Sequence, residues 1–152
     1  MADYIALAAC ILIAAAGGIW DIRVRRIPNL VSLALAAAAL GYLMLQSDFD
    51  AGAAKSAGLH AVIALLVGMA LFRLGVIGGG DAKLYAAGAL GVPLGKALFM
   101  LGWTSVAGLV LLIVMMIMRR LGMPVGPRDD KGHVLVPYGV AIAAGFAVTL
   151  LE

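Results

Sequence analysis

The chain has 152 residues, of which 64% are hydrophobic and 12% are charged, and its formal net charge is +3. Soluble domains are about half apolar and about a quarter charged, and a chain of this length could not bury so much apolar surface in water. The composition therefore excludes an ordinary soluble domain, gives no reason to expect a nucleic-acid partner, and predicts a protein embedded in a lipid bilayer.

Six apolar segments follow one another along the chain, separated by polar, glycine-rich or proline-containing connections. A membrane-spanning helix needs about 20 mostly apolar residues, so about six spans fill this length and leave no room for a separate soluble domain. We expect an all-α fold in which residues 1–152 form a single transmembrane domain. The predicted helices are residues 4–20, 29–45, 57–74, 82–91, 96–118 and 134–151.

The first apolar segment differs from a cleaved signal peptide in its charge order. A signal peptide carries positive charge before its apolar stretch, whereas here Asp3 comes before it and Arg23, Arg25 and Arg26 come after it. We therefore expect a retained helix with its N-terminus on the outer side of the membrane. The only cysteine, Cys10, lies within this segment, which excludes an internal disulfide and a cysteine-rich zinc site.

The fourth predicted helix, residues 82–91, is short, because ten residues rise only about 15 Å, half the hydrocarbon thickness. If all six helices cross, nine of the 11 Lys and Arg residues are cytoplasmic and two are outside. If the fourth helix does not cross, the Lys and Arg residues are divided almost evenly between the two sides of the membrane, five on one and six on the other. The positive-inside rule therefore favours six crossings with both termini outside. The preceding glycines, Gly78, Gly79 and Gly80, would then enter the membrane, where irregular backbone is tolerated if protein buries it.

Two aspartates, Asp21 and Asp81, share the cytoplasmic side in this topology. Ionisable side chains at membrane depth are costly and are functional candidates. Two carboxylates close together do not both ionise readily, so one can act as base and the other as acid on one water, which suits peptide hydrolysis. The ordinary alternatives are an interfacial carboxylate for Asp21 and a helix cap for Asp81. Three glycines exceed what a cap needs and leave space for an extended substrate to approach.

Several motifs together resemble one known family. Asp21 is followed by arginine-rich residues and Ile27-Pro28-Asn29, then by Gly78-Gly79-Gly80-Asp81-Ala82-Lys83-Leu84, then by Val136-Pro137-Tyr138-Gly139. With these motifs on six predicted helices, the chain resembles the type IV prepilin peptidases, which are GxGD-type intramembrane aspartyl proteases. The resemblance covers nearly the whole chain and is greatest to the short branch that serves Flp/Tad pili.

The resemblance implies an aspartic-type endopeptidase with Asp21 and Asp81 as its catalytic pair and without a metal or organic cofactor. Its substrate would be a prepilin, cut on the cytoplasmic side of the bacterial inner membrane between a short basic leader and an apolar helix. Larger relatives carry two Cys-x-x-Cys pairs linked to N-methylation, whereas this chain has one cysteine, so we expect no methyltransferase activity. The expected substrate contacts are Gly78, Gly79, Gly80, Lys83, Pro28, Asn29 and Pro137.

Some alternatives stay open at this point. Lys83 lies two residues past Asp81, so on a helix its side chain points away from Asp81. We expect it to contact the substrate or a lipid headgroup; the ordinary alternative is a lysine that simply extends to the membrane surface. The same aspartates could serve a small cation- or proton-coupled transporter with an ion site beside a broken helix. The sequence disfavours a transporter, because it shows no inverted repeat and places both aspartates near one membrane face. A third class is a pilus-assembly scaffold without catalysis.

Overall fold

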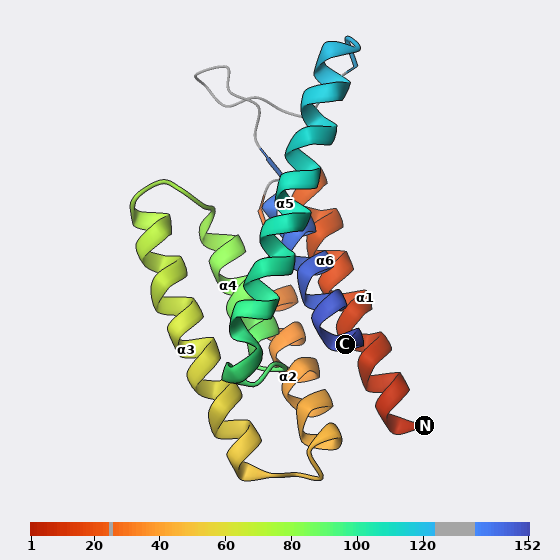
Figure 1. Cartoon of the computed structure of the whole chain (residues 1–152), viewed down its shortest axis with the longest axis vertical. Helices are drawn as coiled ribbons and strands as arrows, with labels where there is room; N and C mark the ends of the chain where they lie inside the picture. Colours follow the sequence, from red (N-terminus) through yellow and green to blue (C-terminus); the bar gives the residue numbers. More distant parts are fainter. Residues whose placement is uncertain (25, 124–135) are drawn as a thin grey trace.

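The computed structural model describes residues 1–24, 26–123 and 136–152. Arg25, Arg128, Lys131 and the predicted start of the last helix at Val134 lie outside the described residues. The described part is helical and contains no strand (Figure 1). Its elements are α1 (Ala2–Val24), α2 (Asn29–Gln46), α3 (Ala51–Arg73), α4 (Gly79–Ala89), the 3-10 helix η1 (Leu94–Lys96), α5 (Ala97–Arg120) and α6 (Tyr138–Leu151). The prediction of an all-α fold with six helices is confirmed.

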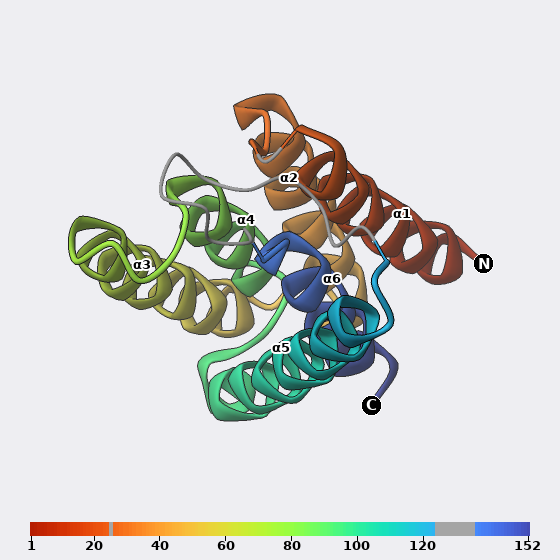
Figure 2. The same ribbon diagram turned by 90° about the horizontal axis from the view of Figure 1, so that it is seen from above.

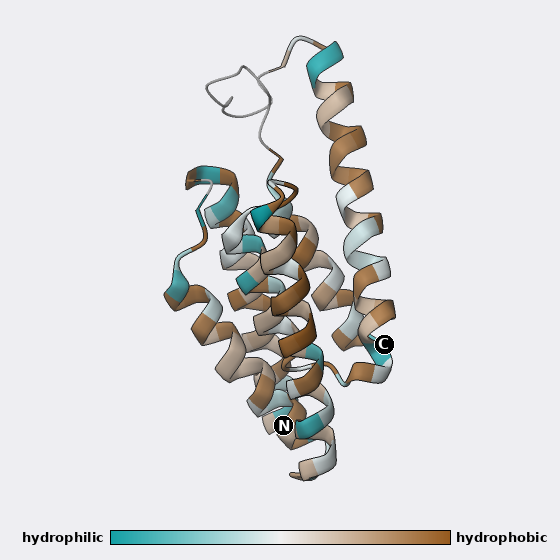
Figure 3. Cartoon of the chain, turned by 90° about the vertical axis from the view of Figure 1, so that its left-hand side faces the viewer, coloured by the Kyte–Doolittle hydropathy of each residue, from teal (hydrophilic) through white to brown (hydrophobic). Residues whose placement is uncertain are grey.

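Four helical segments are long and apolar enough to cross a membrane: α1, α2, α3 and the continuous stretch Leu94–Arg120. The apolar helix α6 is shorter, with 14 residues. Hydrophobic residues cover most of the length of each long helix (Figure 3). Side chains such as Leu12, Leu66 and Leu109 are more than half exposed, which a bilayer accommodates and water does not. The chain is therefore an integral membrane protein.

The short helix α4 lies at the centre of the bundle. It packs against α1, α2, α3 and α6, and α6 in turn packs between α1 and α5 (Figure 2). Seven of the eleven α4 residues are buried, and Leu84 is fully enclosed by the core. Because other helices surround α4, its backbone ends are shielded from lipid by protein, and a helix shorter than the bilayer is tolerated there.

Several helix boundaries differ from the predicted ones. Helix α3 begins at Ala51, six residues earlier than predicted, because Asp50 caps it and accepts a 2.8 Å hydrogen bond from the Ala53 N–H. Helix α4 begins at Gly79, so Gly79, Gly80 and Asp81 form its first turn, although the glycines were expected to precede the helix. Helix α6 begins at Tyr138, directly after Pro137.

Glycines mark the closest helix crossings. A methyl group on Gly68 of α3 would lie 2.8 Å from Cβ of Ala82 on α4. Gly145 of α6 lies directly against the backbone of Thr104 on α5. Membrane helices associate largely through such close backbone packing, because lipid offers no hydrophobic driving force between them. These contacts fix α4 against α3, and α6 against α5.

The ends of the helices gather at two opposite ends of the bundle. Both termini lie at the same end as the α2–α3 connection, while the end of α1 and the beginnings of α4 and α6 lie at the other end (Figure 1). Asp21 is in the last turns of α1 and Asp81 is in the first turn of α4. The fold therefore brings both aspartates to one end.

Candidate active site

Asp21 is held by the N-terminus of a distant helix. Its side chain is 7% exposed, and its Oδ2 accepts a 3.0 Å hydrogen bond from the backbone N–H of Gly139. Gly139 is the second residue of α6, where N–H groups have no partner within the helix. The positive end of the α6 dipole and this N–H both favour a carboxylate at this position. The contact joins α1 to α6 across 118 residues of sequence.

Asp81 is also bonded at the start of a helix, in this case its own helix α4. Its side chain is 8% exposed, and its Oδ2 accepts a 3.2 Å hydrogen bond from the backbone N–H of Gly78, the residue that caps α4. The alternative reading of Asp81 as the helix N-cap is wrong, because Gly78 is the N-cap and Asp81 lies in the first turn, where it bonds the N–H of Gly78. Each aspartate thus accepts an N–H at the start of a helix: Asp21 from the second residue of α6, and Asp81 from the N-cap residue of α4.

Ile27 packs at the starts of both helices. This side chain is 8% exposed. A methyl group on Gly80 would lie 3.2 Å from Cβ of Ile27, and one on Gly139 would lie 3.1 Å from its Cδ1 and 3.0 Å from Cβ of Asp21. Ile27 therefore lies between the residue that precedes Asp81 and the residue that bonds Asp21. Only glycine fits at the two helix starts without moving Ile27.

The space beside the three consecutive glycines is taken by the chain itself. A methyl group on Gly79 would meet the ring of Phe72 at 3.3 Å, and one on Gly78 would lie 2.7 Å from Oδ2 of Asp81. Together with Ile27 at Gly80, these contacts occupy the position that a side chain would take at each of the three glycines. The expected approach of a substrate backbone to this segment stays a prediction.

The other expected substrate contacts divide into two places. Lys83 Nζ donates a 3.1 Å hydrogen bond to Oδ1 of Asn29, the first residue of α2, and Pro28 caps that helix. Pro137 is buried and caps α6, next to Gly139. The structure therefore brings Asn29 to Lys83, and Pro137 to the Asp21 contact.

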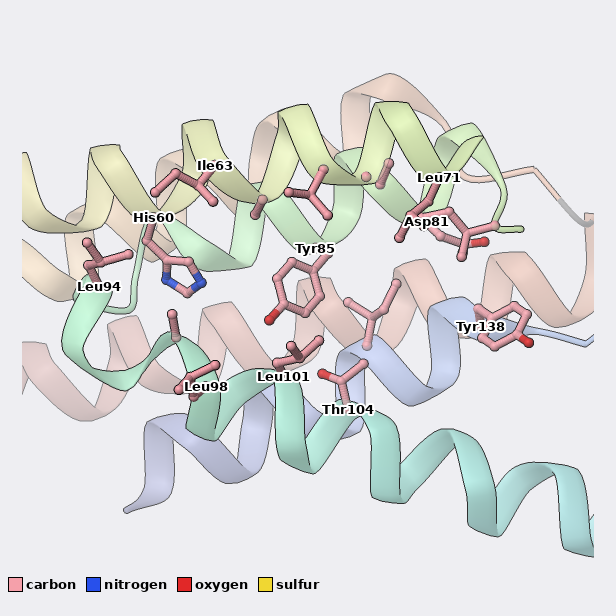
Figure 4. Close-up of a pocket in the computed structure, with 17 residues that line it drawn as sticks. His60, Ile63, Leu71, Asp81, Tyr85, Leu94, Leu98, Leu101, Thr104 and Tyr138 are labelled. Atoms are coloured by element: carbon pink, nitrogen blue, oxygen red, sulfur yellow. The ribbon is translucent and has the colours of Figure 1, made fainter. Parts of the chain in front are cut away.

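A cavity of about 350 Å³ extends from Asp81 into the bundle. It is bounded by α3, α4, α5, α6 and η1, and its lining is almost entirely apolar. We call it the Asp81 cavity. Asp81 and Tyr138 lie towards one end and His60 towards the other (Figure 4). Nδ1 of His60 lies 2.9 Å from the Val92 carbonyl oxygen, so this buried histidine joins α3 to the segment after α4.

Sequence reasoning did not identify Tyr85 and Thr104, which line the Asp81 cavity between its two ends (Figure 4). Tyr85 lies four residues past Asp81 on α4, and this spacing places both on one face of a helix, so the sequence contained a signal for it. Thr104 lies on α5, and nothing in its local sequence connects it to Asp81. Lys83 does not line this cavity, in agreement with its two-residue spacing from Asp81.

In residues 1–24, 26–123 and 136–152, no group of three or more His, Cys, Asp or Glu side chains is arranged to hold a metal ion. The described site contains the two carboxylates of Asp21 and Asp81 and the backbone N–H groups that bond them.

Comparison with known proteins identifies one family. The profile of the type IV leader peptidase family matches residues 6–113, more than two thirds of the chain. The matched region contains Asp21, Ile27 and Asp81 and ends before α6. No curated protein and no solved structure matches the chain. The chain belongs to the type IV leader peptidase family, also known as the type IV prepilin peptidases.

Proposed function

We propose that this peptidase cuts Flp-type prepilins at the cytoplasmic face of the bacterial inner membrane, using Asp21 and Asp81 as its catalytic pair. One observation carries the proposal: both buried carboxylates lie at the same end of the bundle, each bonded to a helix-start N–H. Family membership favours a peptidase over a transporter or a scaffold without catalysis. Ile27 packs beside Gly80 and Gly139 at the two helix starts, and in this proposal it keeps the two aspartates aligned.

In the proposed reaction the two carboxyl groups share one proton. The ionised carboxylate accepts a proton from water while the water oxygen attacks the scissile carbonyl carbon. The protonated carboxyl group gives its proton to the leaving amine as the C–N bond breaks. The pair ends the cycle with one proton, as it began, and the scheme assigns no step to a metal or an organic cofactor. Because the chain has one cysteine and no Cys-x-x-Cys pair, we propose that the new amino terminus is left unmethylated.

The orientation in the membrane follows from charge. Arg23, Arg26 and Arg73 lie near the end of the bundle that carries the aspartates, and Lys55 and Lys96 lie near the opposite end. Positive residues accumulate on the cytoplasmic side, so the aspartate end faces the cytoplasm and both termini face outside.

The Asp81 cavity is the proposed docking site for apolar side chains at the start of the substrate helix, since about 350 Å³ holds a few side chains and not a whole helix. Its apolar lining suits these side chains, and Asp81 at its cytoplasmic end would stand where that helix begins. The basic leader would then lie next to a carboxylate, which is favourable. The other face of α4 carries Lys83, whose charge would repel such a leader.

The test is removal of each carboxylate in turn. Asp21→Asn and Asp81→Asn keep side-chain size but cannot accept the proton, so each should lower prepilin cleavage by at least about 1,000-fold, as loss of a catalytic proton acceptor does in other proteases. Cleavage is followed by the mobility of a co-expressed prepilin, and folding by the elution of the purified variant on size exclusion.

The matched control is Asp48→Asn, at the α2–α3 connection on the opposite end of the bundle. Asp48 is exposed with φ of 49°, a conformation that Asn adopts as readily as Asp. This variant should cleave at the wild-type rate. Normal cleavage by either active-site variant would exclude the proposed pair. Ion flux into proteoliposomes that Asp81→Asn abolishes, without any peptide cleavage, would instead support a transporter.

A further inference from the structure

A second hollow lies on the other side of α4, away from the Asp81 cavity. It has a volume of about 620 Å³ and is formed by α2 and α3 as walls and α4 as floor. We call it the Lys83 groove. Its middle is lined by small and apolar side chains, among them Ala36, Ala61 and Ala87. Leu33 and Val62 also line it and are 67% and 54% exposed, so its rim is open to the bilayer.

Polar groups gather at one end of the Lys83 groove, the end at which α2 begins. Lys83 and Asn29 both line it, and the hydrogen bond from Lys83 Nζ to Asn29 Oδ1 uses one of the three donors of the ammonium group. Ser32 lines it one helical turn further along α2. This serine is 8% exposed, and its Oγ has no hydrogen-bond partner among the described residues. A buried hydroxyl without a partner is unfavourable until a water, an ion or a ligand atom bonds it, and this one belongs to a residue that lines the Lys83 groove.

We propose that the Lys83 groove binds an anionic phospholipid of the cytoplasmic leaflet. The phosphate would accept hydrogen bonds from the ammonium of Lys83, the Ser32 hydroxyl would bond an oxygen of the glycerol or ester region, and an acyl chain would lie along the apolar middle of the groove. A cationic head site continued by an apolar channel open to the bilayer matches this molecule in both charge and shape.

The position of the Lys83 groove argues against two other occupants. A basic leader peptide would meet the ammonium of Lys83 and be repelled by it. Inorganic phosphate would satisfy Lys83 but would leave the apolar middle of the groove unfilled. A phospholipid accounts for both parts, and it would join α2 to α4 two residues beyond Asp81. Lipid binding of this kind is independent of whether Asp21 and Asp81 are the catalytic pair.

The experiment measures lipid retained by the purified protein. Native mass spectrometry and thermal unfolding are run in neutral detergent with added phosphatidylglycerol, phosphatidylcholine or inorganic phosphate. We expect one phosphatidylglycerol to bind, with at least about ten-fold higher affinity than phosphatidylcholine, and to raise the unfolding midpoint. Lys83→Gln should lose this preference, Lys83→Arg should keep it, and Ser32→Ala should weaken binding.

Two matched controls separate the Lys83 groove from general effects. Gly58→Leu adds a side chain within the groove, where a Cβ meets no atom within 4 Å, so it should block binding without disturbing the fold. Gly41→Leu makes the same change in similarly open space on α2, outside the groove, and should bind as wild type. Lys55→Gln removes one charge from the far end of α3 and should also bind as wild type.

The lipid-binding measurements test the Lys83 groove independently of the cleavage assays, because Asp21→Asn protein should bind phosphatidylglycerol as the wild type does. Equal binding of phosphatidylglycerol and phosphatidylcholine would overturn it. So would unchanged binding by both Lys83→Gln and Gly58→Leu, or equal stabilisation by inorganic phosphate alone.

Discussion

Gly139 and Asp21 join the two ends of the chain: the N–H of Gly139 donates a 3.0 Å hydrogen bond to Oδ2 of Asp21. Helix α6 therefore contributes a backbone N–H to the candidate active site, at the residue that follows Tyr138 of the Asp81 cavity. The absence of a side chain at residue 139 is equally important, because Cβ of Asp21 and Cδ1 of Ile27 occupy the space beside it. This relationship explains why a glycine stands at the second position of a helix, where it is otherwise unfavourable.

The first prediction concerns Gly139→Ala. The added methyl group would lie 3.0 Å from Cβ of Asp21, so Asp21 or the start of α6 must shift by a few tenths of an ångström or more. Small misplacements of catalytic groups are costly, and we expect prepilin cleavage to fall about 10- to 100-fold. Initial rates with a purified prepilin in detergent give the measurement.

The control for this prediction is Gly108→Ala on α5. A methyl group there would lie 3.7 Å from Cβ of Ala141, an ordinary van der Waals contact with α6. Its cleavage rate should stay within about two-fold of wild type, because it adds a helix-favouring residue without a clash. Equal rates for the Gly139 and Gly108 variants would show that the Asp21 contact does not position a reacting group.

The second prediction concerns Ile27, which packs at the starts of both α4 and α6. Ile27→Ala should lower the free energy of unfolding by about 2–5 kcal/mol and Ile27→Val by about 0.5–1.5 kcal/mol, because buried methyl groups are lost. Cleavage should fall in the same order, since the segments that carry Asp21 and Asp81 lose the side chain between them. Unfolding is followed by circular dichroism during titration with a denaturing detergent.

Ile19→Ala is the matched control, because Ile19 lies on α1 and is 52% exposed. It removes the same atoms from a lipid-facing position and should change stability by less than about 0.5 kcal/mol. If Ile27→Ala is destabilised but cleaves at the wild-type rate once folded, Ile27 supports the fold without aligning the aspartates.

Hydropathy and charge predict much of this arrangement from the sequence alone. The apolar segments gave all six helices, and the charge count placed Asp21 and Asp81 on one side, which agrees with their common end of the bundle. These features depend on the hydropathy and charge of short segments, which can be read directly from the sequence. Helix starts at Asp50 and Gly79 were harder to place, because capping depends on single hydrogen bonds.

The roles of individual glycines could not be predicted from the sequence. Three consecutive glycines suggested open space for a substrate, whereas Phe72 and Ile27 fill the space beside Gly79 and Gly80. A glycine permits close approach, but the sequence does not say which neighbour approaches. The two hollows on either side of α4 were unpredictable for the same reason: they depend on how α2, α3 and α5 are spaced around it.

The last prediction concerns the Asp81 cavity as the docking site for the start of the prepilin helix. Ala64 on α3 lines this cavity, so Ala64→Phe should fill part of it and raise KM for prepilin at least about ten-fold, while kcat changes little because the aspartates are untouched. Ala70→Phe is the matched control: Ala70 lies on the same helix, exposed and outside both hollows, and its KM should equal that of wild type. Steady-state kinetics over a range of prepilin concentrations separates the two constants. If folded Ala64→Phe has the KM of wild type, the substrate helix docks elsewhere on the bundle. If kcat falls together with the rise in KM, the added ring displaces α4 and Asp81 and does not simply compete with the substrate.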